Sequence, residues 1–95
     1  MAKGNKLPYG KITDAEDLGR YIRAQRKAQD ITQADFAALC GVGNRFISEL
    51  ENGKPTMELG KVLHVLKSLG LEIHVTPRGQ TSSWYDDQRS KGQDE

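Results

Sequence analysis

The sequence predicts an all-α domain with one short strand appended near its carboxyl end, and three observations support this prediction. Two short helical patterns flank a glycine between residues 32 and 54. An amphipathic run over residues 56–69 repeats its apolar side chains at helical spacing. Only residues 71–76, LEIHVT, alternate apolar and polar side chains with the period of two that is typical of a strand.

The length of the chain and the distribution of its apolar residues predict one domain between two polar ends. Ninety-five residues suffice for a single domain. All but one of the Leu, Ile, Val and Phe residues lie between Ile12 and Val75. We therefore expect a flexible basic arm over residues 1–12, a folded domain over 13–76 and a flexible polar tail over 77–95.

Composition also narrows the chemistry. The 14 basic and 13 acidic residues leave a net charge of +1, so nucleic-acid binding would depend on local placement of charge. A single cysteine excludes an internal disulfide, and Cys40, His64 and His74 have no metal-site or catalytic arrangement around them. No apolar run has the length of a membrane span, and no signal peptide is recognisable. We expect a cytoplasmic protein that is not an enzyme and has no cofactor, metal or membrane partner.

The first helix is predicted over about residues 14–28. Thr13 and Glu16 fit a capping box, in which Thr13 caps the helix and Glu16 reaches back to it. Gln25 is a polar residue on the same face as Leu18 and Ile22. This apolar face is therefore expected to be thin.

The next two helices are short and are separated by a glycine. Thr32 is a suitable cap for the first of them, and Gly41 provides the left-handed stop. The second runs from about residue 43 to 51, and Gly53 ends it. Val42 is an apolar residue in the turn between them. The side chains expected to face the core are Phe36, Ala37 and Cys40 in one helix and Phe46, Ile47 and Leu50 in the other. This order of elements is a helix-turn-helix.

A fourth helix is predicted after Pro55, which forces an extended residue before it. Thr56 is a suitable cap and Gly70 a suitable stop. The apolar face is predicted to consist of Leu59, Val62, Leu63, Leu66 and Leu69.

The lone strand at residues 71–76 needs a partner, because its backbone donors and acceptors cannot remain unpaired. The most economical partner is the same strand of a second copy, paired antiparallel about a two-fold axis. We therefore expect a homodimer in which Leu71, Ile73 and Val75 belong to the shared strand pair.

The run TQADFAALCGVGNRFISELENGK, residues 32–54, resembles the lambda-repressor-like, or XRE, helix-turn-helix family. The resemblance extends back through Leu18, Ile22 and Arg26 and forward to Leu69, so it covers more than half of the chain. It implies a repressor-like domain of four to five helices that binds double-stranded DNA. The matching pieces are Thr32-Gln33, Phe36-Ala37, Gly41-Val42, Ile47-Ser48 and Leu50-Glu51-Asn52-Gly53-Lys54.

The second helix of the motif carries the candidate base contacts, because a short exposed helix after such a turn fits the major groove. Arg45 suits guanine, Asn44 suits adenine, and Ser48 suits a base or a phosphate. The family carries base readout at these three positions. Glu49 is able to accept from cytosine but repels phosphate, so it is assigned no DNA contact. The alternative is a solvated helix with no partner.

Further roles follow from the resemblance. It implies DNA phosphate contacts at Gln33, Gly43, Asn52 and Lys54, for which simple capping or surface roles are about equally expected. Gly43 replaces the usual Ser or Thr of the family and so removes a side-chain cap. Arg26 and Glu51 resemble a charged pair that family members bury between helices. The alternative is two solvated charges.

A repressor domain followed by one strand and a polar tail most resembles HipB-type antitoxins. Those proteins dimerise through the strand, repress their own operon and bind a HipA-type serine/threonine kinase toxin. The resemblance implies a repressor at a palindromic operator, associated with the nucleoid when bound. Trp84, alone in the polar tail, is then expected to anchor the toxin partner. Its alternative role is packing onto its own domain.

Two other functions remain open from the sequence. One is a phage or metabolic XRE-type repressor without a toxin partner. The other is a protein-interaction module that has lost DNA binding. The polar helix that carries Arg45 argues against the second, since interaction surfaces more often expose apolar side chains.

Overall fold

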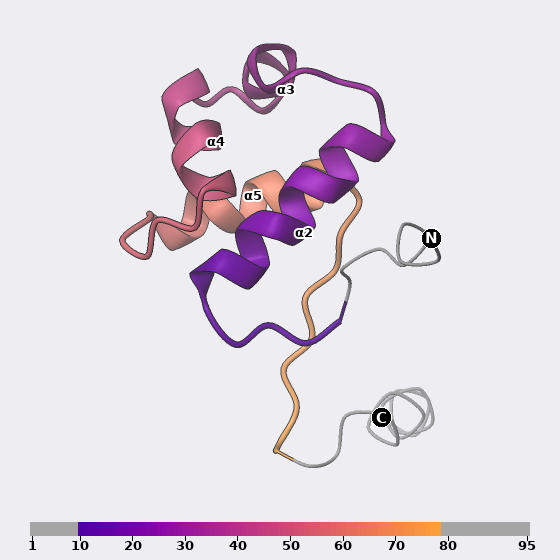
Figure 1. The fold of residues 1–95 in the computed structure, drawn as a ribbon, viewed down its shortest axis with the longest axis vertical. Helices are drawn as coiled ribbons and strands as arrows, with labels where there is room; N and C mark the ends of the chain where they lie inside the picture. The colour runs from indigo at the N-terminus through magenta and orange to yellow at the C-terminus, as the bar shows by residue number, and fades with distance from the viewer. Residues whose placement is uncertain (1–9, 79–95) are drawn as a thin grey trace.

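The computed structural model describes residues 10–78, which contain four α-helices and no β-strand. The helices are α2 (Ala15–Ala28), α3 (Gln33–Cys40), α4 (Asn44–Glu51) and α5 (Leu59–Ser68). In Figure 1, α2 crosses the front of the molecule, α5 lies behind it, and α3 and α4 meet at a steep angle. The predicted all-α, repressor-like fold is confirmed. Residues 1–9 of the expected arm and 79–95 of the expected tail, including Trp84, lie outside the described residues.

The N-cap of helix α2 is Asp14, one residue after the predicted cap, Thr13. The Asp14 side chain accepts from the backbone N–H of Asp17 at 2.9 Å, and the Asp17 carboxylate accepts from the backbone N–H of Thr13 at 2.8 Å. The prediction that Thr13 caps and Glu16 reaches back is therefore wrong. Glu16 instead lies against the turn after α4, where a Cβ added to Gly53 would be 2.7 Å from Glu16 Cγ.

The polar face of α2 is used to hold the end of α5. Gln25 Nε2 donates to the carbonyl oxygen of Leu69 at 3.1 Å, and Gln29 Nε2 donates to the same oxygen at 3.0 Å. Leu69 is the C-cap of α5, and carbonyls at a helix end have no partner within the helix. Gln25 therefore satisfies a backbone group. Gly70, with a φ of 80°, ends the helix as predicted.

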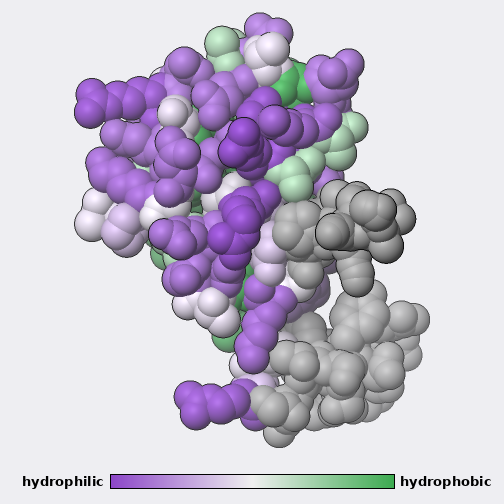
Figure 2. Space-filling view, in the orientation of Figure 1, coloured by the Kyte–Doolittle hydropathy of each residue, from purple (hydrophilic) through white to green (hydrophobic). Residues whose placement is uncertain are grey.

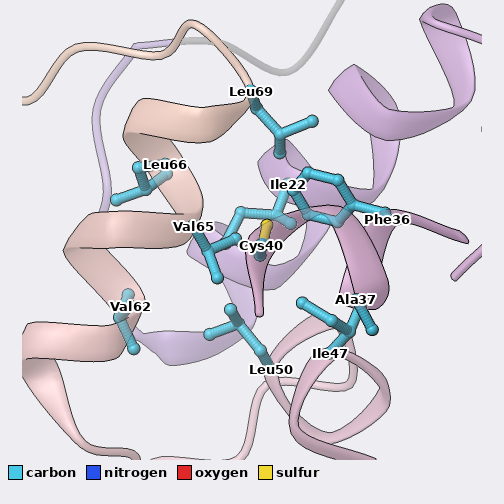
Figure 3. Packing of buried hydrophobic residues seen from close by; sticks show 10 residues of the cluster. All are labelled: Ile22, Phe36, Ala37, Cys40, Ile47, Leu50, Val62, Val65, Leu66 and Leu69. Atoms are coloured by element: carbon cyan, nitrogen blue, oxygen red, sulfur yellow. The ribbon is translucent and has the colours of Figure 1, made fainter. Parts of the chain in front are cut away.

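The core lies where the four helices meet, and Figure 3 shows their apolar side chains converging. Burying each large side chain contributes about 1.5–3 kcal/mol. The core predictions for α3 and α4 are confirmed. Phe46 packs against the core but is half-buried, with the ammonium of Lys61 5.8 Å from its ring centre. The buried apolar residues are Ile22, Phe36, Ala37, Cys40, Ile47, Leu50, Val62, Val65, Leu66 and Leu69.

Helix α5 differs from its prediction in its start and in one side of its face. Its N-cap is Glu58, without a side-chain hydrogen bond, so the prediction that Thr56 caps it is wrong. Leu59 and Leu63 are 67% and 44% exposed, whereas Val65 is fully buried. The neighbouring helices cover the side of α5 that carries Val65, and the two leucines remain at the surface.

Residues 71–78 leave the helices without forming a strand in the single chain (Figure 1, orange). Leu71 packs against the core and is half-buried. Ile73 and Val75 are 47% and 85% exposed. Because the expected pairing needs a second copy of the chain, the shared strand stays a prediction.

Candidate nucleic-acid interface

The turn between α3 and α4 is held by local hydrogen bonds. Thr32 Oγ1 accepts from the N–H of Asp35 at 3.1 Å and so caps α3 as predicted. Gly41 adopts the left-handed conformation with a φ of 76°. The N–H groups of Gly41 and Val42 both donate to the carbonyl of Ala37, at 2.9 and 3.0 Å. The chain therefore turns within residues 41–43, and Val42 packs half-buried against the core.

Helix α4 has an apolar inner side and a polar outer side. Ile47 and Leu50 are buried, while Asn44 and Arg45 are exposed and Ser48 is half-exposed. Its N-cap, Gly43, has an extended backbone and makes no side-chain hydrogen bond. The three candidate base contacts thus share a helix whose other side is fixed in the core.

The outer side carries a charged group that we call the outer cluster: Arg45, Glu49 and Lys54. Arg45 Nε donates to Glu49 Oε2 at 3.1 Å, and Lys54 Nζ donates to Glu49 Oε1 at 3.3 Å. The hydrogen bond from Arg45 is the main cause that lowers the pKa of Glu49 below its ordinary value of 4.5, and Lys54 adds to it. The Arg45 side chain is 88% exposed. The cluster therefore presents two cations to solvent around one ionised carboxylate.

The inner side carries a second group, the inner cluster: Arg26, Glu51 and Gln33. Arg26 Nε donates to Glu51 Oε2 at 2.6 Å, and Arg26 Nη2 donates to Oε1 at 3.0 Å. Gln33 Nε2 donates to Glu51 Oε1 at 3.0 Å, and Arg26 Nη1 donates to the carbonyl of Ile31 at 2.7 Å. The structure thus brings Arg26 and Glu51 together, with side chains 8% and 2% exposed. The cluster joins α2, α3 and α4.

The candidate phosphate contacts occupy three places around α4. Gln33 is the first residue of α3 and is half-buried by its bond to Glu51. Gly43 precedes α4, Asn52 is its exposed C-cap, and Lys54 follows two residues later. Contact of these residues with phosphate stays a prediction.

Two contacts in this region were not predicted from the sequence. Glu49 links Arg45 and Lys54, and its spacing of four residues from Arg45 was a visible signal. Gly19 of α2 is buried against α4, and a Cβ there would be 2.6 Å from the carbonyl oxygens of Leu50 and Glu51. Nothing local in the sequence marks this close approach.

Within residues 10–78, no group of three or more His, Cys, Asp or Glu side chains is arranged to hold a metal ion. None of the helices in the same range is long and apolar enough to cross a membrane. The face of the molecule seen in Figure 2 is mostly hydrophilic, with small scattered apolar areas. Polar and charged side chains therefore dominate this face.

A capped helix, a one-residue left-handed stop and a second helix with a polar outer side define a helix-turn-helix domain. Residues 22–74 match the model of the helix-turn-helix family. The chain therefore belongs to the XRE-type helix-turn-helix family of transcriptional regulators.

Two proteins of Sinorhizobium fredii (strain NBRC 101917 / NGR234) are similar in sequence. The HTH-type transcriptional regulator y4mF is 44% identical over 80 residues, which cover 84% of this chain and 96% of that protein. The HTH-type transcriptional regulator y4dL is 33% identical over 63 residues, which cover 66% of this chain but 32% of the longer protein.

Solved structures of HipB have the same fold. A HipB–O1–O2 complex aligns with a TM-score of 0.66 at 25% identity, covering 73% of this chain and 100% of that one. A HipA–HipB–O2–O3 complex aligns with a TM-score of 0.67 at 24% identity, covering 74% of this chain and 99% of that one. The fold is therefore that of HipB.

Proposed function

We propose that the protein is a sequence-specific repressor that binds a palindromic operator as a homodimer. We further propose that it is the antitoxin of a toxin–antitoxin pair, which represses its own operon and binds a HipA-type serine/threonine kinase toxin. The observation that carries the DNA-binding part is the exposed, polar outer side of α4 beside Lys54. The antitoxin part is supported by the likeness to HipB, including a structure that also holds HipA.

In this proposal α4 enters the major groove and the residues around it bind the backbone. Arg45 reads guanine, Asn44 reads adenine, and Ser48 contacts a base or a phosphate. Phosphates are bound at the four positions that surround α4. These positions are Gln33, Gly43, Asn52 and Lys54.

Two alanine variants test the division between base and phosphate contacts. Arg45→Ala is expected to weaken binding to the preferred duplex by about 1–3 kcal/mol and to relax its sequence preference. Lys54→Ala is expected to weaken all sequences alike and to reduce the salt slope by about 1. Fluorescence anisotropy would compare a duplex selected by the unmodified protein from a random pool with a scrambled duplex. Equal affinity of the unmodified protein for both would refute sequence-specific binding.

Dimerisation through residues 71–76 is supported by the exposure of Ile73 and Val75 in the single chain. Antiparallel pairing about a two-fold axis would separate the two α4 helices by roughly 34–36 Å, one duplex turn, or a multiple of it. Ile73→Pro removes a ladder hydrogen bond and is expected to yield monomers in sedimentation velocity, whereas Ile73→Val keeps the dimer. A monomeric unmodified protein at micromolar concentration would contradict this part.

Binding to the toxin is proposed to involve Trp84. A large aromatic side chain is a frequent anchor in protein interfaces. Trp84→Ala is expected to weaken binding of the kinase while leaving operator affinity unchanged. Purification from the native host, followed by identification of bound proteins, tests the partner itself. If no kinase accompanies the protein, a repressor without a toxin partner is favoured.

A further inference from the structure

We propose that Glu49 determines how strongly the protein discriminates its operator from other DNA, by positioning Arg45 and by offsetting the charge of Lys54. This inference rests on the proposed function. Glu49 is the one acidic side chain of the outer cluster, and each of its carboxylate oxygens accepts from a different cation. It is a positioning residue, because its effect on the bases acts through Arg45.

The first step is the orientation of the Arg45 guanidinium. Glu49 Oε2 accepts from Nε of Arg45, on the side of the group nearest the helix. Within residues 10–78, the two terminal Nη groups of Arg45 make no hydrogen bond. A pair of donors in this fork matches the O6 and N7 acceptors of guanine. Glu49 therefore binds Nε of Arg45 and leaves the two Nη groups for the base.

The second step is the placement of Lys54. Its backbone N–H donates to the carbonyl of Glu49 at 3.1 Å, and its Nζ donates to the Glu49 carboxylate at 3.3 Å. Glu49 thus binds Lys54 through both the main chain and the side chain. A single residue, Glu49, therefore fixes the placement of the base-reading Arg45 relative to the phosphate-binding Lys54.

The third step concerns charge. Phosphate contacts raise affinity for all DNA sequences alike. A carboxylate between the two cations leaves a local charge of +1 instead of +2 and repels phosphate oxygens. Affinity for unrelated DNA is thereby lowered, while a well-placed Arg45 compensates for this loss only where guanine is present. The ratio of the two affinities, and not the affinity itself, is what Glu49 increases.

The test is Glu49→Gln, which keeps the size of the side chain and removes its charge. Binding is measured by anisotropy at several salt concentrations, with the selected and the scrambled duplexes. We expect higher affinity for the scrambled duplex, a salt slope steeper by about 0.9 and a ratio about tenfold lower. In the Arg45→Ala background, the same change is expected to leave the ratio unaltered.

Glu58→Gln is the matched control. Glu58 is an exposed glutamate paired with Lys61 at 3.7 Å, so the same charge is removed outside the outer cluster. Any gain in affinity should then be equal for both duplexes. Circular dichroism establishes that each variant is folded.

The outcomes separate this inference from the proposed function. If the unmodified protein does not discriminate between the duplexes, the proposed function itself fails. If it discriminates and Glu49→Gln keeps the ratio, only the inference about Glu49 is overturned. A fall in the ratio that persists without Arg45 would overturn the positioning of Arg45.

Discussion

Helix α4 carries two glutamates two residues apart, and each accepts hydrogen bonds from an arginine. Glu51 faces inward, with a side chain 2% exposed, and also accepts from Gln33. Glu49 faces outward, with a side chain 30% exposed, and also accepts from Lys54. Both clusters are therefore built on an arginine–glutamate pair, and the surroundings of each pair decide what it does.

The difference lies in the free energy of removing one partner. The inner cluster has lost its water, and its charges are compensated by four hydrogen bonds of 2.6 to 3.0 Å. Loss of one partner leaves a buried charge without compensation. In the outer cluster, water replaces a lost partner, so the pair contributes little to stability. The inner cluster can therefore fix the fold while the outer cluster remains free to exchange partners.

Glu51→Ala is expected to have the largest effect, because it leaves the Arg26 guanidinium buried without its carboxylate. We expect a loss of about 3–5 kcal/mol in the free energy of unfolding. Urea denaturation followed by circular dichroism measures it. Replacing both partners together, as Arg26→Met with Glu51→Leu, should cost less than Glu51→Ala alone. A loss below about 1 kcal/mol for Glu51→Ala would remove the contrast with the outer cluster.

Gly19→Ala sharpens the comparison by adding one atom at the inner side of α4. Its Cβ would lie 2.6 Å from two carbonyl oxygens of α4, so we expect a loss of about 1–3 kcal/mol despite the better helix propensity of alanine. Gly60→Ala is the matched control. No atom lies within 4 Å of a Cβ added there, so stability should stay equal or rise by up to about 1 kcal/mol. Thermal unfolding of both variants distinguishes the two sites, and equal behaviour would contradict the close approach.

Glu49→Ala tests the opposite side of the comparison. Because water replaces the lost partners in the outer cluster, stability should change much less than in Glu51→Ala. The change should shrink further as salt is added. A loss comparable to that of Glu51→Ala would mean that the outer cluster also supports the fold.

The smallest effect is expected from Asp17, a half-buried residue at the start of α2. Hydrogen bonds from the hydroxyl and N–H groups of Thr13, and the charge of Arg20, lower the pKa of Asp17 below its ordinary value of 3.8. A lowered pKa in the folded state stabilises the protein above the unfolded value, and this contribution is lost as pH falls through the folded value. Asp17→Asn should therefore be slightly less stable than the unmodified protein at pH 7, with the gap closing in acid. Urea denaturation of the two proteins at pH 7 and at acidic pH measures this difference in stability.

The elements predicted best from the sequence are those that depend on neighbouring residues. Thr32 and Gly41 bound α3 as expected because a cap and a left-handed stop involve only bonds within a few residues. At the start of α2, two adjacent residues, Thr13 and Asp14, have side chains that can cap a helix. The contact of Glu16 with the turn at Gly53 is long-range, and it left the capping roles to Asp14 and Asp17.

What the sequence could not predict depends on partners distant along the chain. Helix α5 has apolar residues on more than one side, so only the positions of the other helices decide that Val65 is inside and Leu63 outside. From the sequence, Gln25 only interrupts the apolar face of α2, because its hydrogen bond to Leu69 joins residues far apart in the chain. In the candidate site, the exposed outer side of α4 was predictable from the helical spacing of its apolar residues. The link that Glu49 makes between Arg45 and Lys54 required coordinates, because Lys54 lies beyond the end of the helix.

The paired bonds from Gln25 and Gln29 to the Leu69 carbonyl have a mechanical consequence. They fasten the end of α5 to α2, and α2 packs directly on α4. Residues 71–78 thus follow a helix end that is anchored to α2 by two hydrogen bonds. Because α2 in turn contacts α4, the start of this segment is connected to α4 through packed helices. In the proposed dimer, these two glutamine side chains would therefore help to fix the distance between the two α4 helices.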